Sequence, residues 1–373
     1  MKKVLLGTSA LLSVSFLAGT AVAYDGVKLS LGGFMRSYYG ITVDDDGANE
    51  IGDDHNLDGV GTDAEIYFLG SVTLDNGVTV GARIELEAEN EADQIDAAYA
   101  FFKGGFGDIR IGSQAGAAGN MYMLPPGSTA NFGPYSPNTS GAVILPAFDP
   151  EGTLTRQDKS QKVAYYSPIW SGFSFGLSYT PNDDEEGYSG DDDADGTFHP
   201  FRESDSANHN VGLGLHYDYQ GDGWGLALGG AAYWEGDVED AGQNGGDADE
   251  QAGYNAGVNL SFGNLSFGTA FTFLDDGAGT KGDDVWMVGV GGAYEIDAWT
   301  FGLGWAHVNS ENAAVDDDDN KLDRYALTGS YAMGPGIDID AALAYTRVES
   351  ADESDGADDY DAFEVSVGSS IKF

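Results

Sequence analysis

The sequence predicts an all-β fold: a 16-stranded antiparallel β-barrel that spans a membrane. Three observations support this prediction. Stretches of alternating apolar and small polar residues recur from Val27 to Phe373. Tight turns and long connections alternate strictly between these stretches. After the N-terminal leader, no segment approaches the roughly 18 consecutive apolar residues that a spanning helix needs. Alternation of this kind places one face of each strand against lipid and the other against water.

The N-terminus has the pattern of a secretory signal peptide. Lys2 and Lys3 form a basic start, residues 4–18 are mostly apolar, and Ala21-Val22-Ala23 supplies small residues for cleavage before Tyr24. These features are typical of a leader that is removed after export, and an uncleaved membrane anchor is the alternative. We therefore predict a signal peptide at residues 1–23 and a barrel domain at residues 24–373.

The strands carry one uniformly apolar row each. In residues 27–41, the first row begins Val27, Leu29 and Leu31, whereas the intervening row begins with Lys28 and Ser30. An Arg or Lys on a lipid-facing row at mid-membrane would cost about 2–4 kcal/mol, so a charge-free row is the expected lipid face. The same alternation, with no charge on the apolar row, is clear in residues 211–219, 265–273 and 299–305.

The connections fall into two classes that alternate along the chain. Gly-rich and Asn-Gly pairs supply the positive φ angles that tight hairpins require. The tight turns therefore all lie at one end of the sheet, as in an up-and-down barrel, whereas a soluble sandwich would not sort its loops in this way. The tight turns include 75–77, 104–105, 221–222, 263–264, 297–298 and 334–336, and the long connections are near 42–62, 90–93, 114–160, 181–207, 235–250, 275–284, 310–320 and 350–360.

The composition excludes several classes of protein. The formal net charge is −46, and removal of Lys2 and Lys3 would make it more negative. Nucleic-acid binding needs a basic face and is excluded on this ground. Cysteine is absent, so neither a disulfide nor a thiolate metal site can form. The five histidines are scattered without metal-ligand spacing, at positions 55, 199, 209, 216 and 307.

Most acidic residues lie in the long connections, in runs such as 44–46, 191–193 and 316–319. Like charges this dense repel unless they are screened. Either high salt hydrates these loops, or bound Ca²⁺ or Mg²⁺ joins them. Asp191, Asp193 and Asp195 resemble the start of a calcium loop, but the twelfth position is Arg202 and not a glutamate. We favour solvated loops and expect no resident cofactor.

The chain resembles the general porins of Gram-negative outer membranes, of the alphaproteobacterial type. The resemblance is carried by the opening run 27–33, by the hairpin at residues 98–112, and by the closing row that ends at the aromatic Phe373, which resembles a barrel-assembly signal. It implies a 16-stranded outer-membrane channel, usually a homotrimer, that passes small hydrophilic solutes by diffusion. It also implies contact with outer-membrane lipids, including lipopolysaccharide.

The resemblance further implies that the third long connection, residues 114–160, folds into the barrel and narrows it. Its composition suits an inner position, because it contains six prolines and few acids, namely Asp149, Glu151 and Asp158. An external flap is the alternative. The Pro-Glu-Phe-Gly-Gly run that many relatives carry in this loop is missing here, which leaves the acid that faces the pore unassigned.

Strand parity gives the expected pore groups. In similar porins, basic side chains on the wall oppose acids on the inserted loop, and the resulting field orders dipolar solutes. Glu65 and Glu85 would make the lumen negative and favour cations. The alternative for each arginine is a rim charge paired with a neighbouring acid. We expect the basic wall to comprise Arg36, Arg83, Arg110 and Lys162, with Asp149 and Glu151 opposite.

Other functions remain as alternatives. An outer-membrane hydrolase would need a nucleophile beside a histidine, and no such arrangement accompanies the histidines. A substrate-specific channel would show a ladder of lumen aromatics, and Phe34, Tyr38, Tyr67 and Phe102 on lumen parity form no evident ladder. A non-conducting barrel that serves as an adhesin is the third alternative.

Overall fold

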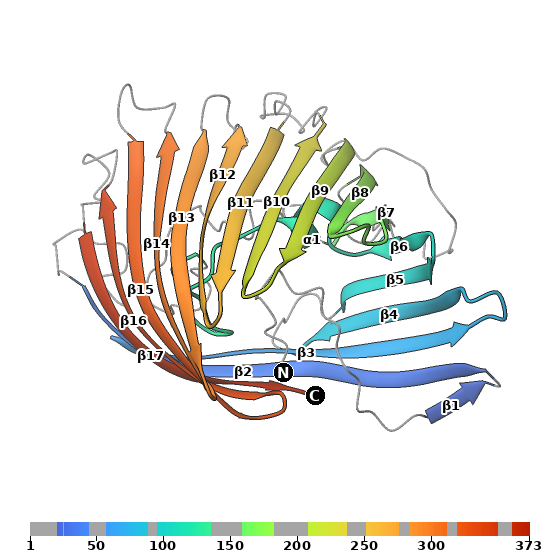
Figure 1. Ribbon diagram of the computed structural model, residues 1–373, viewed down its shortest axis with the longest axis horizontal. Coiled ribbons are helices and arrows are strands. Elements are labelled where there is room, and N and C mark those ends of the chain that lie inside the picture. The colour runs from blue at the N-terminus through green and yellow to red at the C-terminus, as the bar shows by residue number, and fades with distance from the viewer. Residues whose placement is uncertain are drawn as a thin grey trace, which may run out of the picture.

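The computed structural model describes residues 21–24, 26–44, 57–88, 95–135, 159–182, 208–236, 251–275, 284–311, 319–349 and 360–373. It is dominated by one antiparallel sheet, in which each strand pairs with the next along the chain (Figure 1). The strands are β1 (Ala21–Tyr24), β2 (Val27–Asp44), β3 (Asp58–Thr73), β4 (Thr79–Glu87), β5 (Ile95–Gly104), β6 (Gly107–Ser113), β7 (Gln161–Tyr166), β8 (Phe173–Asn182), β9 (Asn208–Gln220), β10 (Trp224–Glu235), β11 (Gln251–Phe262), β12 (Leu265–Asp275), β13 (Val285–Ile296), β14 (Trp299–Glu311), β15 (Asp319–Gly334), β16 (Ile337–Glu349) and β17 (Tyr360–Lys372).

The sheet closes on itself through its first and last long strands. β17 pairs antiparallel with β2, so that the 16 described strands β2 to β17 form a closed barrel. Phe373 completes the seam, because its backbone N–H donates to the Gly33 carbonyl at 3.1 Å and its carbonyl accepts from the Gly33 N–H at 2.9 Å. Closure pairs the strand edges that an open sheet would expose. The predicted fold class is confirmed.

β1 lies outside this closed ring and pairs only with the start of β2, where Ala21 is opposite Leu29. Cleavage before Tyr24 would remove all of β1 except its last residue. The β2–β17 seam does not depend on β1.

The alternation read from the sequence separates the two faces of the wall. In β14, the outward residues Phe301 and Leu303 are 47% and 64% exposed, whereas the inward Gly302 and Gly304 are buried. The inward row of β16 includes Ala342 and Thr346, which are also buried. The outward faces therefore form the apolar surface expected against lipid. No helix among the described residues is long and apolar enough to cross a membrane.

The tight turns join strands at one end, as predicted. β3–β4, β5–β6, β9–β10 and the later hairpins are linked by a few residues each, and Gly77 and Gly336 adopt positive φ angles of 82° and 72° in two of these turns. The strand ends that the long connections join lie at the other end, and most residues of these connections fall outside the described part of the chain. The wall is uneven in height, because β6 and β7 have seven and six residues whereas β15 has 16.

Candidate functional site

The segment Gln114–Tyr135, which we call the inner segment, follows β6 and lies on the inward face of the sheet. It includes the short helix α1 (Ala117–Met121), which contacts β7 to β10 (Figure 1). The Ala117 N–H donates to the Ser178 hydroxyl of β8 at 2.9 Å. The chain then crosses β11, where the Met123 N–H donates to Asn255 Oδ1 at 2.7 Å. The first half of the predicted loop 114–160 therefore occupies the barrel interior, and residues 136–158 lie outside the described part.

Further along the wall, inward polar side chains hold the backbone of the inner segment. Asn259 of β11 donates to the Leu124 carbonyl at 3.0 Å, and Thr328 of β15 donates to the Gly127 carbonyl at 2.9 Å. A backbone that leaves the sheet must satisfy its carbonyl groups elsewhere, and these amides and hydroxyls supply donors. The small polar residues on the inward rows of this wall therefore hydrogen-bond to the backbone of the inner segment.

Glycines on β13 and β14 allow the inner segment to approach the wall closely. A Cβ atom at Gly291 would overlap the Pro126 carbonyl oxygen and the Tyr135 hydroxyl, and one at Gly304 would lie 2.5 Å from Pro134 Cγ. Tyr135 is 1% exposed in this contact, and its hydroxyl donates to the Pro126 carbonyl at 3.4 Å. Burial raises the pKa of Tyr135, so its hydroxyl stays neutral.

The tip of the inner segment is fixed by two buried polar contacts. Asn131 is fully buried, and its amide donates to Asp340 Oδ2 of β16 at 2.7 Å. Arg324 of β15 donates to the Gly133 carbonyl at 3.4 Å and to Glu364 of β17 at 3.1 Å. Both members of the Arg324–Glu364 pair are about 5% exposed. A buried ion pair of this kind needs all of its partners, because an unpaired charge in such a place is costly.

Lys162 of β7 occupies a different place from the one expected for a pore-lining base. Its side chain is 3% exposed, and its ammonium group donates to the carbonyls of Gln114 at 2.6 Å and Ser160 at 2.7 Å. It points inward, as strand parity predicts, but it joins the two roots of the 114–160 connection. Its role in the basic wall stays a prediction.

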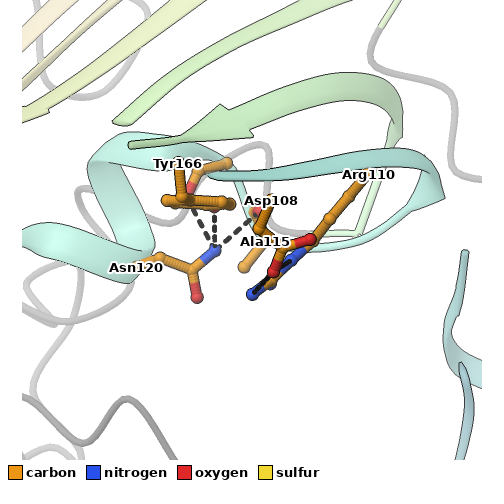
Figure 2. Close-up of polar contacts among 6 residues, drawn as sticks. Asp108, Arg110, Ala115, Asn120 and Tyr166 are labelled. Carbon is orange, nitrogen blue, oxygen red and sulfur yellow. Dashed lines mark hydrogen bonds and ion pairs between the residues drawn. The ribbon is translucent and has the colours of Figure 1, made fainter. Parts of the chain in front are cut away.

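The three predicted arginines lie on the opposite wall, and each is paired with a carboxylate. Arg36 of β2 contacts Asp63 of β3 at 2.9 Å, and this pair is the most open of the three, with side chains 33% and 44% exposed. Arg83 of β4 pairs with Glu85 on the same strand. On β6, Arg110 contacts Asp108 at 3.1 Å (Figure 2). The three arginines therefore face inward, as strand parity predicts, and each is also paired with a neighbouring acid, as the alternative hypothesis predicts.

Each arginine also lies over an aromatic ring of the same wall. The Arg36 guanidinium is 4.6 Å from the centre of the Phe34 ring, and that of Arg83 is 4.2 Å from the Tyr67 ring. The Phe34 and Tyr67 rings are themselves 6.4 Å apart. Arg110 lies between two rings, at 4.6 Å from that of Tyr166 and 5.5 Å from that of Tyr99. We call this set of three arginines and four aromatic residues the arginine–aromatic wall.

The arginine–aromatic wall touches the inner segment at one end. Tyr166 of β7 lies beside α1, and the Asn120 amide is 2.6 Å from its hydroxyl (Figure 2). The same amide group donates to the Ala115 carbonyl at 2.9 Å. Arg110, Tyr166 and the start of the inner segment therefore form one connected group.

The predicted acids are only partly described. Glu65 and Glu85 are both inward-facing and half-buried on the arginine–aromatic side. Carboxylate oxygens of Glu65, Glu87 and Asp96 lie within 4.8 Å of one another, and Lys159 contacts Asp96 at 2.8 Å. The other predicted pore acids and the calcium candidates lie outside the described residues: Asp149, Glu151, Asp191, Asp193 and Asp195.

Sequence reasoning missed several residues of this interior. Arg324, an inward-facing base in the second half of the chain, was not among the predicted pore residues. Phe102 was placed on the lumen face, but the register sets Phe101 opposite the inward Gly81, and Phe102 is an outward residue, 38% exposed. The sequence could not show which of Phe101 and Phe102 faces outward, because either ring fits an apolar outer row. Phe34 and Tyr67 are neighbours, with ring centres 6.4 Å apart, but one pair of rings is not a ladder, and the expectation that no ladder forms stays a prediction.

Comparison with known proteins decides the family. The sequence profile of Gram-negative porins matches residues 8–351, which is most of the chain. The protein belongs to the Gram-negative porin family. No curated protein matches the sequence.

Solved structures agree with this porin at the level of the fold. OmpT in trimer form, an outer membrane protein of Vibrio cholerae, has a TM-score of 0.60 at 13% identity, with 94% of this chain and 100% of that chain covered. An anion-selective porin from Comamonas acidovorans has a TM-score of 0.59 at 15% identity, over 93% and 100% of the two chains. Salmonella typhi OmpF, in complex with daunomycin, has a TM-score of 0.58 at 15% identity, with 93% of this chain and 98% of that chain covered.

Membership in this family assigns the porin to the outer membrane as a channel for diffusion. Family and fold both point to a channel and away from an enzyme. The interior then has two unlike sides: the inner segment covers the wall from β8 to β16, and the arginine–aromatic wall spans β2 to β7.

Proposed function

We propose that the protein is a diffusion channel for small hydrophilic solutes and ions, with a weak to moderate preference for cations. The observation that carries this proposal is the charge balance of the arginine–aromatic side. Arg36, Arg83 and Arg110 are matched there by Asp63, Glu85 and Asp108. Lys159 contacts Asp96, and the carboxylates of Glu65 and Glu87 lie beside Asp96. A lumen surface with excess negative charge attracts cations and repels anions.

The inner segment adds no charge to this balance. Residues 114–135 contain neither an acid nor a base. The charges of the described interior therefore all belong to the barrel wall, where Arg324 on the far side is paired with Glu364. Asp149 and Glu151, as pore acids, would increase the same preference, and Lys162 would reduce it if its charge were felt in the lumen.

Conductance in a planar bilayer tests the proposal. We expect stable steps and a reversal potential under a KCl gradient that has the sign of K⁺ selectivity. Replacement of Glu65 by Gln should shift the reversal potential towards that of an unselective pore. Glu349→Gln is the matched control, since Glu349 is 42% exposed and lies on the outward row of β16. Anion selectivity would contradict the cation preference, and a silent folded barrel would favour a non-conducting adhesin.

We also propose that three copies assemble and that the chain is exported by its leader. Support for the homotrimer comes from the trimer form of the Vibrio cholerae neighbour. The leader 1–23 and the terminal Phe373 carry the export and assembly predictions, and lipopolysaccharide is the expected lipid partner. Mass measurement of the purified protein would test both the cleavage site and the subunit number. Ca²⁺ at Asp191, Asp193 and Asp195 stays a weaker alternative to solvated loops.

A further inference from the structure

We propose that the arginine–aromatic wall is a binding site for aromatic zwitterions, and that aromatic amino acids are the preferred organic permeants of the channel. This inference rests on the proposed channel function and names its solute class. It depends on three features: the alternation of rings and guanidinium groups, the paired carboxylates, and the uncharged surface that faces them.

The first feature is the spread of rings and guanidinium groups over consecutive strands. Their order around the barrel is Phe34 and Arg36 on β2, Tyr67 on β3, Arg83 on β4, Tyr99 on β5, Arg110 on β6 and Tyr166 on β7. Each strand from β2 to β7 thus contributes a flat group. Tyr67 is 4% exposed and packs against the Arg83 guanidinium, whereas the rings of Phe34, Tyr99 and Tyr166 are only partly buried. Flat π-systems bind to aromatic rings and to guanidinium planes, whereas saturated side chains of equal size gain only apolar contact.

The second feature is the pairing of opposite charges along the same surface. The Arg36–Asp63 pair is the most exposed, at 33% and 44%. A guanidinium group has five N–H donors, so one carboxylate contact leaves others for a solute carboxylate. Asp63 likewise retains acceptor capacity for a solute ammonium group. A zwitterion complements both charges at once, whereas a simple anion or cation meets one like charge.

The third feature is the surface on the other side of the lumen. β11 is eight strands from β3 in the closed ring of 16, and Asn255 and Asn259 of β11 hold the inner segment there. Tyr122 and Leu124 of this segment are half-buried and pack against the apolar cluster around Tyr135. A solute held by its charges on the arginine–aromatic wall therefore presents its other side to an uncharged, partly apolar surface.

Two amino acids that differ only in aromaticity give the sharpest test. L-phenylalanine and L-cyclohexylalanine have the same zwitterionic group and the same six-membered ring skeleton. Each is titrated against single channels in a bilayer, and binding is read from solute-induced current noise, normalised to the KCl conductance of the same channel. We expect phenylalanine to bind about fivefold more tightly, which is the size of one cation–π contact.

Variants locate the site. Phe34→Leu and Tyr99→Leu, separately and together, should reduce the preference for phenylalanine over cyclohexylalanine towards unity. Phe271→Leu is the control, because Phe271 is 45% exposed on the outward row of β12. Asp63→Asn should weaken binding of both amino acids and leave their ratio above unity. The comparison in the unmodified protein stands even where a variant does not fold.

The outcomes separate this inference from the proposed function. Channels that conduct KCl but bind the two amino acids equally would overturn the aromatic site and leave the porin function intact. A preference that persists in the Phe34→Leu, Tyr99→Leu double variant would also overturn it, because the site would then lie elsewhere. A folded protein without conducting steps would overturn the proposed function itself.

Discussion

Arg324 and Glu364 form a buried ion pair, 3.1 Å apart, on the inward face of the barrel. They come from β15 and β17, on either side of β16, and the intervening Thr346 accepts a hydrogen bond from Arg324 at 2.9 Å. Ser366 donates to the other Glu364 oxygen at 2.6 Å. Because Arg324 also donates to the Gly133 carbonyl at 3.4 Å, this pair links three wall strands to the inner segment.

Replacement of Arg324 by Met should destabilise the barrel strongly. The Glu364 carboxylate would stay buried without its counter-charge, which typically costs about 3–5 kcal/mol in the free energy of unfolding. Urea unfolding in detergent, followed by the mobility shift between folded and unfolded barrel, measures the change. Arg347→Met is the control, since Arg347 and Glu349 are 55% and 42% exposed and such pairs contribute about 0–1 kcal/mol. Equal effects of the two substitutions would contradict this account.

Replacement of Lys162 by Met should loosen the roots of the inner segment. The ammonium group holds the carbonyls of Gln114 and Ser160, and hydrogen bonds from charged donors are worth about 1.5–3 kcal/mol each. We expect more current noise and a lower unfolding midpoint. Lys103→Met removes a base from an exposed position near a tight turn and should change neither property. If the current noise of Lys162→Met matched that of the unmodified protein, the roots of the inner segment would be held by other contacts.

The outer architecture of this porin was predictable because it depends on local periodicity. The alternation in residues 27–41 and 299–305 places lipid-facing and inward rows correctly, and the same parity brings Arg36, Arg83 and Arg110 to the interior. A period of two residues needs no knowledge of which strands are neighbours.

The interior contacts could not be predicted in the same way, because they depend on pairings between distant parts of the chain. Arg324 and Glu364 are separated by 40 positions, and Asn131 and Asp340 by 209. Parity alone places Lys162 inward, but it cannot show that the side chain is covered by the roots of a loop. The rows of inward glycines on β13 and β14 were visible in the sequence. That they leave room for Pro126 and Pro134 to pack against the wall could be recognised only from the fold.

Replacement of Asn131 by Ala should release the tip of the inner segment. The Asp340 carboxylate would lose the amide donor at 2.7 Å, and loss of one partner in a buried charged hydrogen bond costs about 1–3 kcal/mol or more. The single-channel conductance in KCl should become more variable from channel to channel. Ser128→Ala changes an exposed residue of the same segment and is the control. Indistinguishable conductance distributions for the two variants would show that Asn131 does not fix the tip.

Gly291→Val should displace the inner segment without changing any charge. The first added carbon would already overlap the Pro126 carbonyl and the Tyr135 hydroxyl, so the segment must move away from β13. Overpacking of this kind costs about 1–3 kcal/mol. Displacement should expose the bond after Tyr135 to chymotrypsin, which mass spectrometry of the digested barrel detects.

Gly329→Val is the matched control for this substitution. Gly329 faces outward on β15, and a Cβ there would have its nearest neighbour, Phe301 Cδ1, at 3.8 Å, an ordinary contact. We expect its digestion pattern and unfolding midpoint to follow those of the unmodified protein. If Gly291→Val resists chymotrypsin at Tyr135 as well as the unmodified protein does, strand β13 must have moved instead of the inner segment. Its unfolding midpoint should then lie below that of Gly329→Val. If Gly291→Val kept both its resistance to chymotrypsin and its unfolding midpoint, the close packing of the inner segment against β13 would be contradicted.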